Sequence, residues 1–174
     1  MDFSRLYVNV GPGSYSGIRT AIAFALGYSS TELDNKSNSQ IYTYTSFDLI
    51  KFFAGESSKN NCVFIQSWPR LSKVDASKLE FKNLKGYYQC EDKNMFVNVL
   101  DIDLGKTVFY LPQASVLSKF SKYLKEVASL VIGTQLDNKE KTLEFMENFE
   151  FKNNLEPLYI NPVAITKPNE SKNK

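Results

Sequence analysis

The residues best suited to chemistry lie near the start of the chain, in the Gly-rich segment Gly11-Pro12-Gly13-Ser14-Tyr15-Ser16-Gly17. Backbone N–H groups at the start of a helix can hold an anion, and glycine lets a phosphate approach closely. However, the G-x-G-x-x-x-G spacing is not the dinucleotide-binding fingerprint, and no Gly-Lys-Ser/Thr ending makes it a Walker A loop. Spacing alone therefore favours a tight strand-to-helix turn that packs against its own sheet.

Nucleophilic catalysis has little support in this sequence. Ser14 and Ser16 could act as nucleophiles, but the chain has no histidine and no lysine in this segment to serve as the base. The lack of histidine also excludes Ser-His-Asp and Cys-His catalysis and every His-ligated metal site. We expect one of the two serines to cap the helix that follows.

Two weaker candidates lie further along the chain. Asp101 and Asp103 would share one side of a strand and could bind a divalent cation. A polar strand end that turns at Gly105 is the favoured interpretation of this pair. The run Trp68-Pro69-Arg70 could form a stacking and cation–π surface, although a loop anchor is the simpler role.

The composition narrows the class of protein. The chain has 174 residues, is 43% hydrophobic and carries a formal net charge of +2, which is too balanced for a dedicated nucleic-acid binder. That length suits one domain or two small lobes. No run of eighteen apolar residues occurs, and Met1–Val10 lacks the pattern of a signal peptide. We therefore expect a cytoplasmic protein without a membrane span.

Cys62 and Cys90 are 28 residues apart and could pair only if the fold brings them together. We expect both to be thiols of the core or of strands in a reducing cytosol.

Residues 1–55 alternate between strand and helix patterns, which favours a mostly parallel sheet. Apolar residues recur at helical spacing after the Gly-rich segment, with Gly27 as a weak point near the end of that helix. Ser46 is expected to cap the second helix and Gly55 to end it. The expected elements are a strand at 6–10, a helix from 18, a loop at 29–40, a strand at 41–44, a helix at 47–54 and a linker at 56–61.

The second part of the chain is richer in strand patterns. Pro112 is expected to open one helix and Asp137 to cap another. The expected elements are a strand at 62–65, a hairpin of 79–90 and 94–101 across 91–93, a strand at 106–110, a helix from 112 to about 126, a strand at 130–132, a helix at 139–149, extended pieces at 158–160 and 163–165, and a disordered tail at 167–174.

The segment from Val8 to Arg19 closely resembles the "GPGSFTGLR" segment of the TsaB family, also called YeaZ, with Tyr15, Ser16 and Ile18 as conservative replacements. Glu156–Ile160 with the following 162–164 is similar to the family's C-terminal "EPVYLR" strand, with Asn161 in place of a basic residue. Weaker similarity covers 41–49 and 119–133. The resemblance assigns partner-interface or motif roles to Gly11, Pro12, Gly13, Ser14, Gly17, Ile18, Arg19 and Ile22.

Two departures from the family pattern stand out. Gln66-Ser67-Trp68 occupies the place of the family's "DAR" element. The strand hairpin with an "ILAIDTS"-like segment, which precedes the glycine motif in the family, has no counterpart here. A misassigned start codon, a split gene and a truly reduced protein are the three explanations for the second departure.

The resemblance implies an α/β, actin-like (ASKHA) fold of two ribonuclease-H-like lobes with the first lobe truncated, at residues 1–55 and 62–166, and a tail at 167–174. It implies a non-catalytic subunit without cofactor, metal or catalytic residues. Its partners would be a TsaD-type catalytic homologue, which transfers the threonylcarbamoyl group to adenosine 37 of tRNA, and a TsaE-type ATPase. A homodimer is an alternative assembly. This chain would contact tRNA only as part of the complex.

The helix after the glycine motif agrees with such a role. Its small residues Ala21, Ala23, Ala25 and Gly27 permit close helix–helix approach, and its apolar residues occupy more than one face. Two alternatives stay open at this point. One is a nucleotide-binding, kinase-like or peptidase-like ASKHA enzyme. The other is a non-functional fragment, because losing central strands exposes apolar sheet edges.

Overall fold

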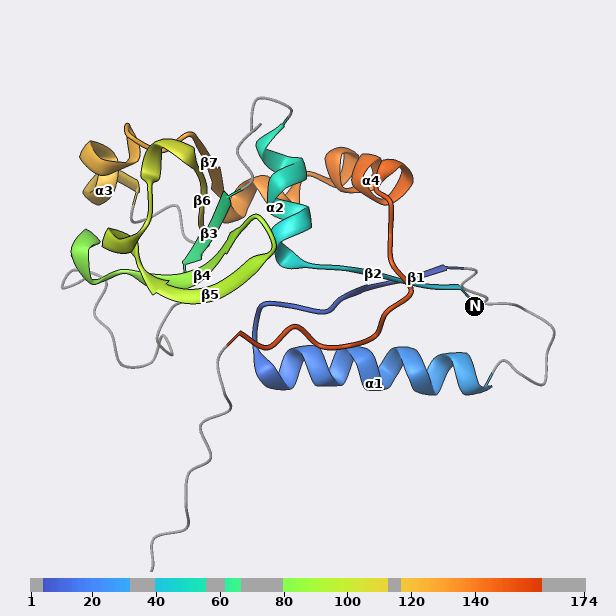
Figure 1. The fold of residues 1–174 in the computed structure, drawn as a ribbon. Coiled ribbons are helices and arrows are strands. Elements are labelled where there is room, and N and C mark those ends of the chain that lie inside the picture. The colour runs from blue at the N-terminus through green and yellow to red at the C-terminus, as the bar shows by residue number, and fades with distance from the viewer. Residues whose placement is uncertain (1–4, 32–39, 56–61, 67–79, 113–116, 161–174) are drawn as a thin grey trace, which may run out of the picture.

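Two sheets of unequal size organise the chain in the computed structural model, which describes residues 5–31, 40–55, 62–66, 80–112 and 117–160 (Figure 1). In the smaller sheet, β1 (Arg5–Asn9) and β2 (Gln40–Tyr44) pair in parallel. They are the two strands on either side of α1 (Tyr15–Thr31) in the sequence. The parallel arrangement that the alternation predicted for residues 1–55 is therefore confirmed for these strands.

The larger sheet has the strand order β5-β4-β3-β6-β7. Strands β3, β6 and β7 are parallel, whereas β4 runs antiparallel to both β3 and β5. The bounds are β3 Cys62–Gln66, β4 Lys85–Cys90, β5 Lys93–Asn98, β6 Thr107–Leu111 and β7 Ser129–Ile132. The predicted hairpin is thus confirmed, although it turns at 91–92 and its strands are shorter than expected.

Helices cover both faces of the larger sheet (Figure 1). Side chains alternate across a strand, so Phe64 packs on the α3 face while Val63 and Ile65 pack on the α2 face. Burial on both faces explains why β3 reads as a continuous apolar run. The helices are α2 Ser46–Ala54, α3 Leu117–Leu124 and α4 Lys139–Asn148, and short 3-10 turns lie at 81–83, 99–101, 104–106 and 133–137.

Two segments connect the sheets. Helix α2 follows β2 in the sequence, yet its Phe47 and Ile50 are buried against the larger sheet. The chain after α4 returns to the smaller sheet, where Lys152 bridges to Thr43 and Leu155 packs near Val8 (Figure 1). The division into lobes at 55 and 62 stays a prediction, as does the actin-like class.

Several predicted helix ends differ from the structure. α1 runs past Gly27 to Thr31, and within its last turn the hydroxyls of Ser29 and Ser30 donate hydrogen bonds to the Leu26 and Gly27 carbonyls. Thr45, not Ser46, caps α2, because it forms a capping box with Asp48.

The second half shows two similar differences. Asn138, not Asp137, caps α4, since its side chain accepts from the Lys141 N–H at 3.0 Å. Pro112 lies in a bend, α3 is described over Leu117–Leu124, and residues 113–116 of the predicted helix lie outside the described residues. The predicted linker at 56–61, the extended piece at 163–165 and the tail lie outside the described residues.

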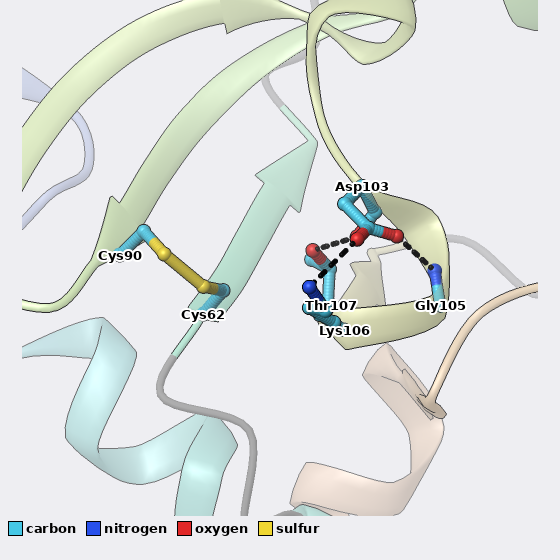
Figure 2. A network of polar contacts seen from close by, with 6 residues as sticks. All are labelled: Cys62, Cys90, Asp103, Gly105, Lys106 and Thr107. Atoms are coloured by element: carbon cyan, nitrogen blue, oxygen red, sulfur yellow. Dashed lines mark hydrogen bonds and ion pairs between the residues drawn. A yellow bond between two sulfur atoms is a disulfide. The ribbon is translucent and has the colours of Figure 1, made fainter.

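The expectation of two free thiols is wrong. Cys62 and Cys90 lie directly opposite one another in the antiparallel β3–β4 pair, with their Cα atoms 4.1 Å apart, and form a disulfide (Figure 2). The register of the antiparallel β3–β4 pair decides this contact, and the spacing of 28 residues alone could not reveal it. Among the helices of the described ranges, none is both long and apolar enough to cross a bilayer.

Candidate functional site

The Gly-rich turn after β1 is held by side chains from two elements. The Asn9 Oδ1 accepts from the Gly11 N–H at 2.8 Å, and the Asn9 Nδ2 donates to the Ser46 Oγ at 3.0 Å. The Ser46 hydroxyl donates to the Pro12 carbonyl at 2.9 Å, and the Ser46 N–H donates to the Gly11 carbonyl at 2.8 Å. The first residue of α2 therefore fixes the course of the turn.

Glycine is required at position 11 for two reasons. Its φ of +116° lies in a region that L side chains rarely adopt. A Cβ there would also lie 2.8 Å from the Leu158 carbonyl oxygen. Gly13 is less restricted, because its nearest neighbour would be the end of the Ile18 side chain at 3.9 Å. The close approach at Gly11 brings the C-terminal segment against the turn, where the Leu158 N–H donates to the Val10 carbonyl at 2.7 Å.

Ser14 stands at the start of α1, as one of the two expected caps. Its Oγ accepts from the Gly17 N–H at 3.4 Å, and its carbonyl accepts from the Ile18 N–H at 2.9 Å. The Ser16 hydroxyl lies 3.4 Å from that of Ser14 on the exposed side of the helix. These contacts, with those of Gly11 and Pro12, are the pattern of a tight turn packed on its own sheet.

α1 has one buried face and one exposed face. Ala25 is buried against the smaller sheet with Ala21 and Ile22 partly buried beside it, and Ile18 is buried with the end of its side chain near Gly11. The opposite side of the helix carries small exposed residues, which are Ser16, Thr20, Ala23 and Gly27. Phe24 and Leu26 flank this stripe and are 63% and 50% exposed. The predicted burial of α1 against its own sheet is therefore confirmed. The large apolar side chains of Phe24 and Leu26 lie outside this buried face.

Arg19 lies on the exposed part of α1 near its first turn. Its Nη1 donates to the Tyr15 hydroxyl at 2.9 Å, and its guanidinium carbon lies 5.3 Å from the centroid of that ring. The Tyr15 ring in turn lies 5.0 Å from the ring of Tyr159. This Tyr15–Tyr159 contact joins the Gly-rich segment to the segment 156–160. Sequence reasoning missed it, because residues 144 positions apart leave no local signal.

The predicted carboxylate pair is not a cation site. Asp101 ends one 3-10 turn, and Asp103 precedes the next, so the two do not share a strand face. One Asp103 oxygen accepts from the Gly105 N–H at 3.1 Å, and the other lies 3.5 Å from the Lys106 Nζ (Figure 2). The turn at Gly105 is therefore confirmed. The described part of the chain holds no group of three His, Cys, Asp or Glu residues able to bind a metal.

The other predicted candidates do not form a described functional site. Trp68, Pro69 and Arg70 lie outside the described residues. Gln66, at the place of the family's acidic residue, is 3% exposed, and its Oε1 has no hydrogen-bond partner among the described residues.

Three partly buried groups away from α1 have shifted pKa values. Burial raises the pKa of the Tyr44 hydroxyl. Burial, with a smaller effect of the Asp137 charge, also raises the pKa of Tyr110. Burial lowers the pKa of Lys51, whose Nζ donates to the Gln89 Oε1 at 2.8 Å. None of these groups lies on the exposed side of α1.

Comparisons with known proteins include a weak structural likeness. No family model matches the sequence, and no curated protein matches it. Among solved structures, the chain is similar to "an uncharacterized protein with similarity to peptidase YEAZ from Pseudomonas aeruginosa". The identity is 10%, the match covers 91% of this chain and 74% of the other, and the TM-score is 0.44. Because that score is below 0.5, this likeness carries no part of the functional argument.

Proposed function

We propose that this chain is a non-catalytic subunit of the tRNA N6-threonylcarbamoyladenosine machinery, which pairs with a TsaD-type catalytic subunit through the exposed face of α1. The resemblance of the Gly-rich segment to the TsaB family motivates the proposal. A TsaE-type ATPase would bind the pair, and this chain would contact tRNA only within the assembled complex.

One observation supports the proposal above all. The two segments that carry the family resemblance lie 144 residues apart in the sequence at Tyr15 and Tyr159, yet they are in contact. The backbone bond between Leu158 and Val10 and the close approach at Gly11 belong to the same contact. Two separate matches that form one structural unit are harder to obtain by chance than either match alone.

The surface of α1 suits a protein partner. Phe24 and Leu26 are large apolar side chains left mostly exposed, on either side of a stripe of small residues. Exposed apolar groups of this kind mark interaction sites when they are contiguous, and small residues let a second helix approach closely.

The test is binding to a purified TsaD-type subunit, measured by calorimetry, together with threonylcarbamoyl transfer to tRNA in the reconstituted system. We expect a 1:1 complex at micromolar concentration and no transfer when this chain is omitted. Phe24→Lys should weaken binding at least about tenfold, because it replaces a large apolar side chain of the proposed contact with a charge. Leu143→Lys is the matched control, since Leu143 is 61% exposed on another helix, α4.

Two results would reject the proposal. The first is the absence of any complex at concentrations up to about 100 μM, far above the micromolar range of specific pairs. The second is turnover of a substrate by this chain alone.

A further inference from the structure

The Cys62–Cys90 disulfide belongs to a row of four side chains that crosses the larger sheet. Cys62 stands opposite Cys90 in the β3–β4 pair and opposite Thr107 in the β3–β6 pair, and Cys90 stands opposite Lys93 in the β4–β5 pair. Directly opposed residues of neighbouring strands share one face of a sheet, so these four side chains lie side by side. Figure 2 shows the disulfide between β3 and β4, with Thr107 on the other side of Cys62.

The two cysteines differ in their access to solvent. Cys62 is 8% exposed, because it lies on β3 between β4 and β6. Its neighbour Thr107 is fully buried, and the Thr107 hydroxyl donates to the Asp103 carbonyl at 2.7 Å. Cys90 is only partly buried at the end of β4, beside the exposed residue Lys93. A small reagent in solution therefore reaches the Cys90 sulfur more easily than the Cys62 sulfur.

Lys93 places a positive charge next to Cys90. Directly opposed residues have Cβ atoms about 4.5–5.5 Å apart, which is within reach of a lysine side chain. Glu91 and Asp92 form the exposed turn between them, whereas Lys93 stands directly opposite Cys90 on the same face. A neighbouring ammonium group favours the thiolate, which is the nucleophile of thiol–disulfide exchange. Cys90 thus combines access with a local positive charge.

The paired strands should hold the two thiols opposite one another when the disulfide is open. β3 pairs with β4 from Cys62 to Gln66 and pairs with β6 on its other side. Val63 and Phe64 are fully buried on opposite faces of β3. These contacts do not involve the sulfur atoms, so they persist in the reduced chain. Two groups held in this way react within one molecule, at a high effective concentration.

We propose that Cys90 is the exchanging thiol and Cys62 the resolving thiol of a pair that reacts reversibly with a low-molecular-weight disulfide of the glutathione class. This inference goes beyond the proposed function and is independent of it, because the pair lies in the larger sheet and α1 covers the smaller one.

The exchange proceeds in two steps. The Cys90 thiolate attacks one sulfur of the small disulfide, so that a mixed disulfide forms, the original sulfur–sulfur bond breaks and one small thiolate leaves. The Cys62 sulfur, on loss of its proton, then attacks the Cys90 sulfur. This second step forms the Cys62–Cys90 bond, breaks the mixed disulfide and releases the second small thiolate. Two protein thiols are oxidised, and one small disulfide is reduced to two thiols, which take up the two protons.

Limited alkylation of the reduced wild-type chain tests the difference between the two thiols. The reduced chain is treated with a small amount of iodoacetamide under native conditions, and the modified peptides are mapped by mass spectrometry. Cys90 should react at least about tenfold faster than Cys62, because access and the nearby charge both favour it. Equal rates would overturn the proposal, since they would mean that the two sulfurs are equally accessible or that the strands separate without the bond.

Oxidised glutathione tests the two steps with a matched pair of serine variants. The reduced wild-type chain should close its disulfide and keep no glutathione adduct. Cys62→Ser should retain one glutathionyl group on Cys90, because the resolving thiol is gone. Cys90→Ser should acquire its adduct at least about tenfold more slowly. A lasting adduct on the wild-type chain, or equal rates for the two variants, would overturn the proposal. Circular dichroism checks that both variants fold, and the alkylation of the wild-type chain decides if they do not.

A pair of lysine variants tests the charge next to Cys90. Lys93→Gln should slow the alkylation of Cys90 by about twofold, because the thiolate fraction falls while the remaining thiolate becomes more nucleophilic. Lys85→Gln is the matched control, since Lys85 is exposed at the other end of β4, and it should leave the rate unchanged. An unchanged rate in Lys93→Gln would overturn the role assigned to Lys93.

Discussion

Gly27 offers a sharp test of the exposed face of α1. It lies inside the helix, and a Cβ placed on it would meet no atom of the described residues within 4 Å beyond the neighbouring backbone of its own helix. Glycine in a helix interior costs about 0.5–1 kcal/mol relative to alanine, because it loses more backbone entropy on folding. Gly27→Ala should therefore raise the free energy of unfolding by that amount, and the Tm by about 1–4 °C in a chain of this size.

The same position distinguishes stability from partner binding. Gly27→Arg should also keep or raise the stability of the isolated chain, since open space receives the side chain. In the complex it should raise the Kd about 5- to 150-fold, because overpacking an interface costs about 1–3 kcal/mol. Gly27→Ala is the matched control and should bind within about threefold of the wild type, because a single methyl group adds little bulk.

Thermal unfolding followed by circular dichroism measures the first effect, and calorimetry measures the second. A lower Tm for Gly27→Ala would refute the reasoning, because it would mean that this side of α1 already contacts something in the isolated chain. Equal binding by Gly27→Arg and the wild type would show that the partner does not cover this face.

Further predictions concern the turn, the disulfide and the pH dependence. Gly11→Ala should lower the free energy of unfolding by more than about 1 kcal/mol, whereas Gly13→Ala should cost less, because only position 11 has a positive φ and a close backbone carbonyl. Urea titration compares the two. Reducing the Cys62–Cys90 disulfide should lower the free energy of unfolding by about 3–4 kcal/mol, from the entropy of the loop that it closes. Thiol titration of the unreduced, unfolded chain should find no free thiol, and two free thiols would contradict this assignment. Burial raises the pKa of Tyr44, so the unfolded chain loses this proton first and stability should fall as the pH rises above about 10. Tyr44→Phe should reduce that fall, and an unchanged pH profile would contradict the role of this hydroxyl.

Local patterns predicted the elements that depend on neighbouring residues. Short strand patterns indicated β1, β2 and the β4–β5 hairpin, and helical spacing indicated α1. The predicted caps of α2 and α4 each differ by one residue from the observed caps, because at each helix two adjacent side chains were able to cap. At α2, Thr45 is the cap because Asp48 stands three residues later and returns the bond. Such a choice depends on where the chain turns, which local composition does not specify.

The candidate site was predictable only in part. The Gly-rich turn and the small residues of α1 are visible in the sequence, because both depend on residue type and short spacing. The covering of the turn by Leu158 and Tyr159 is not visible there, since no local period links them to Val10 and Tyr15.

By itself, the sequence determined where glycine is needed, which segments are strands or helices, and which family the motif resembles. Tertiary structure alone decided that Cys62 faces Cys90, that α2 packs on the larger sheet, and that the C-terminal segment contacts Val10 and Tyr15. The physical reason is the range of the interactions. Backbone preference and capping act within a few residues, whereas strand register and burial depend on which distant segments exclude water together.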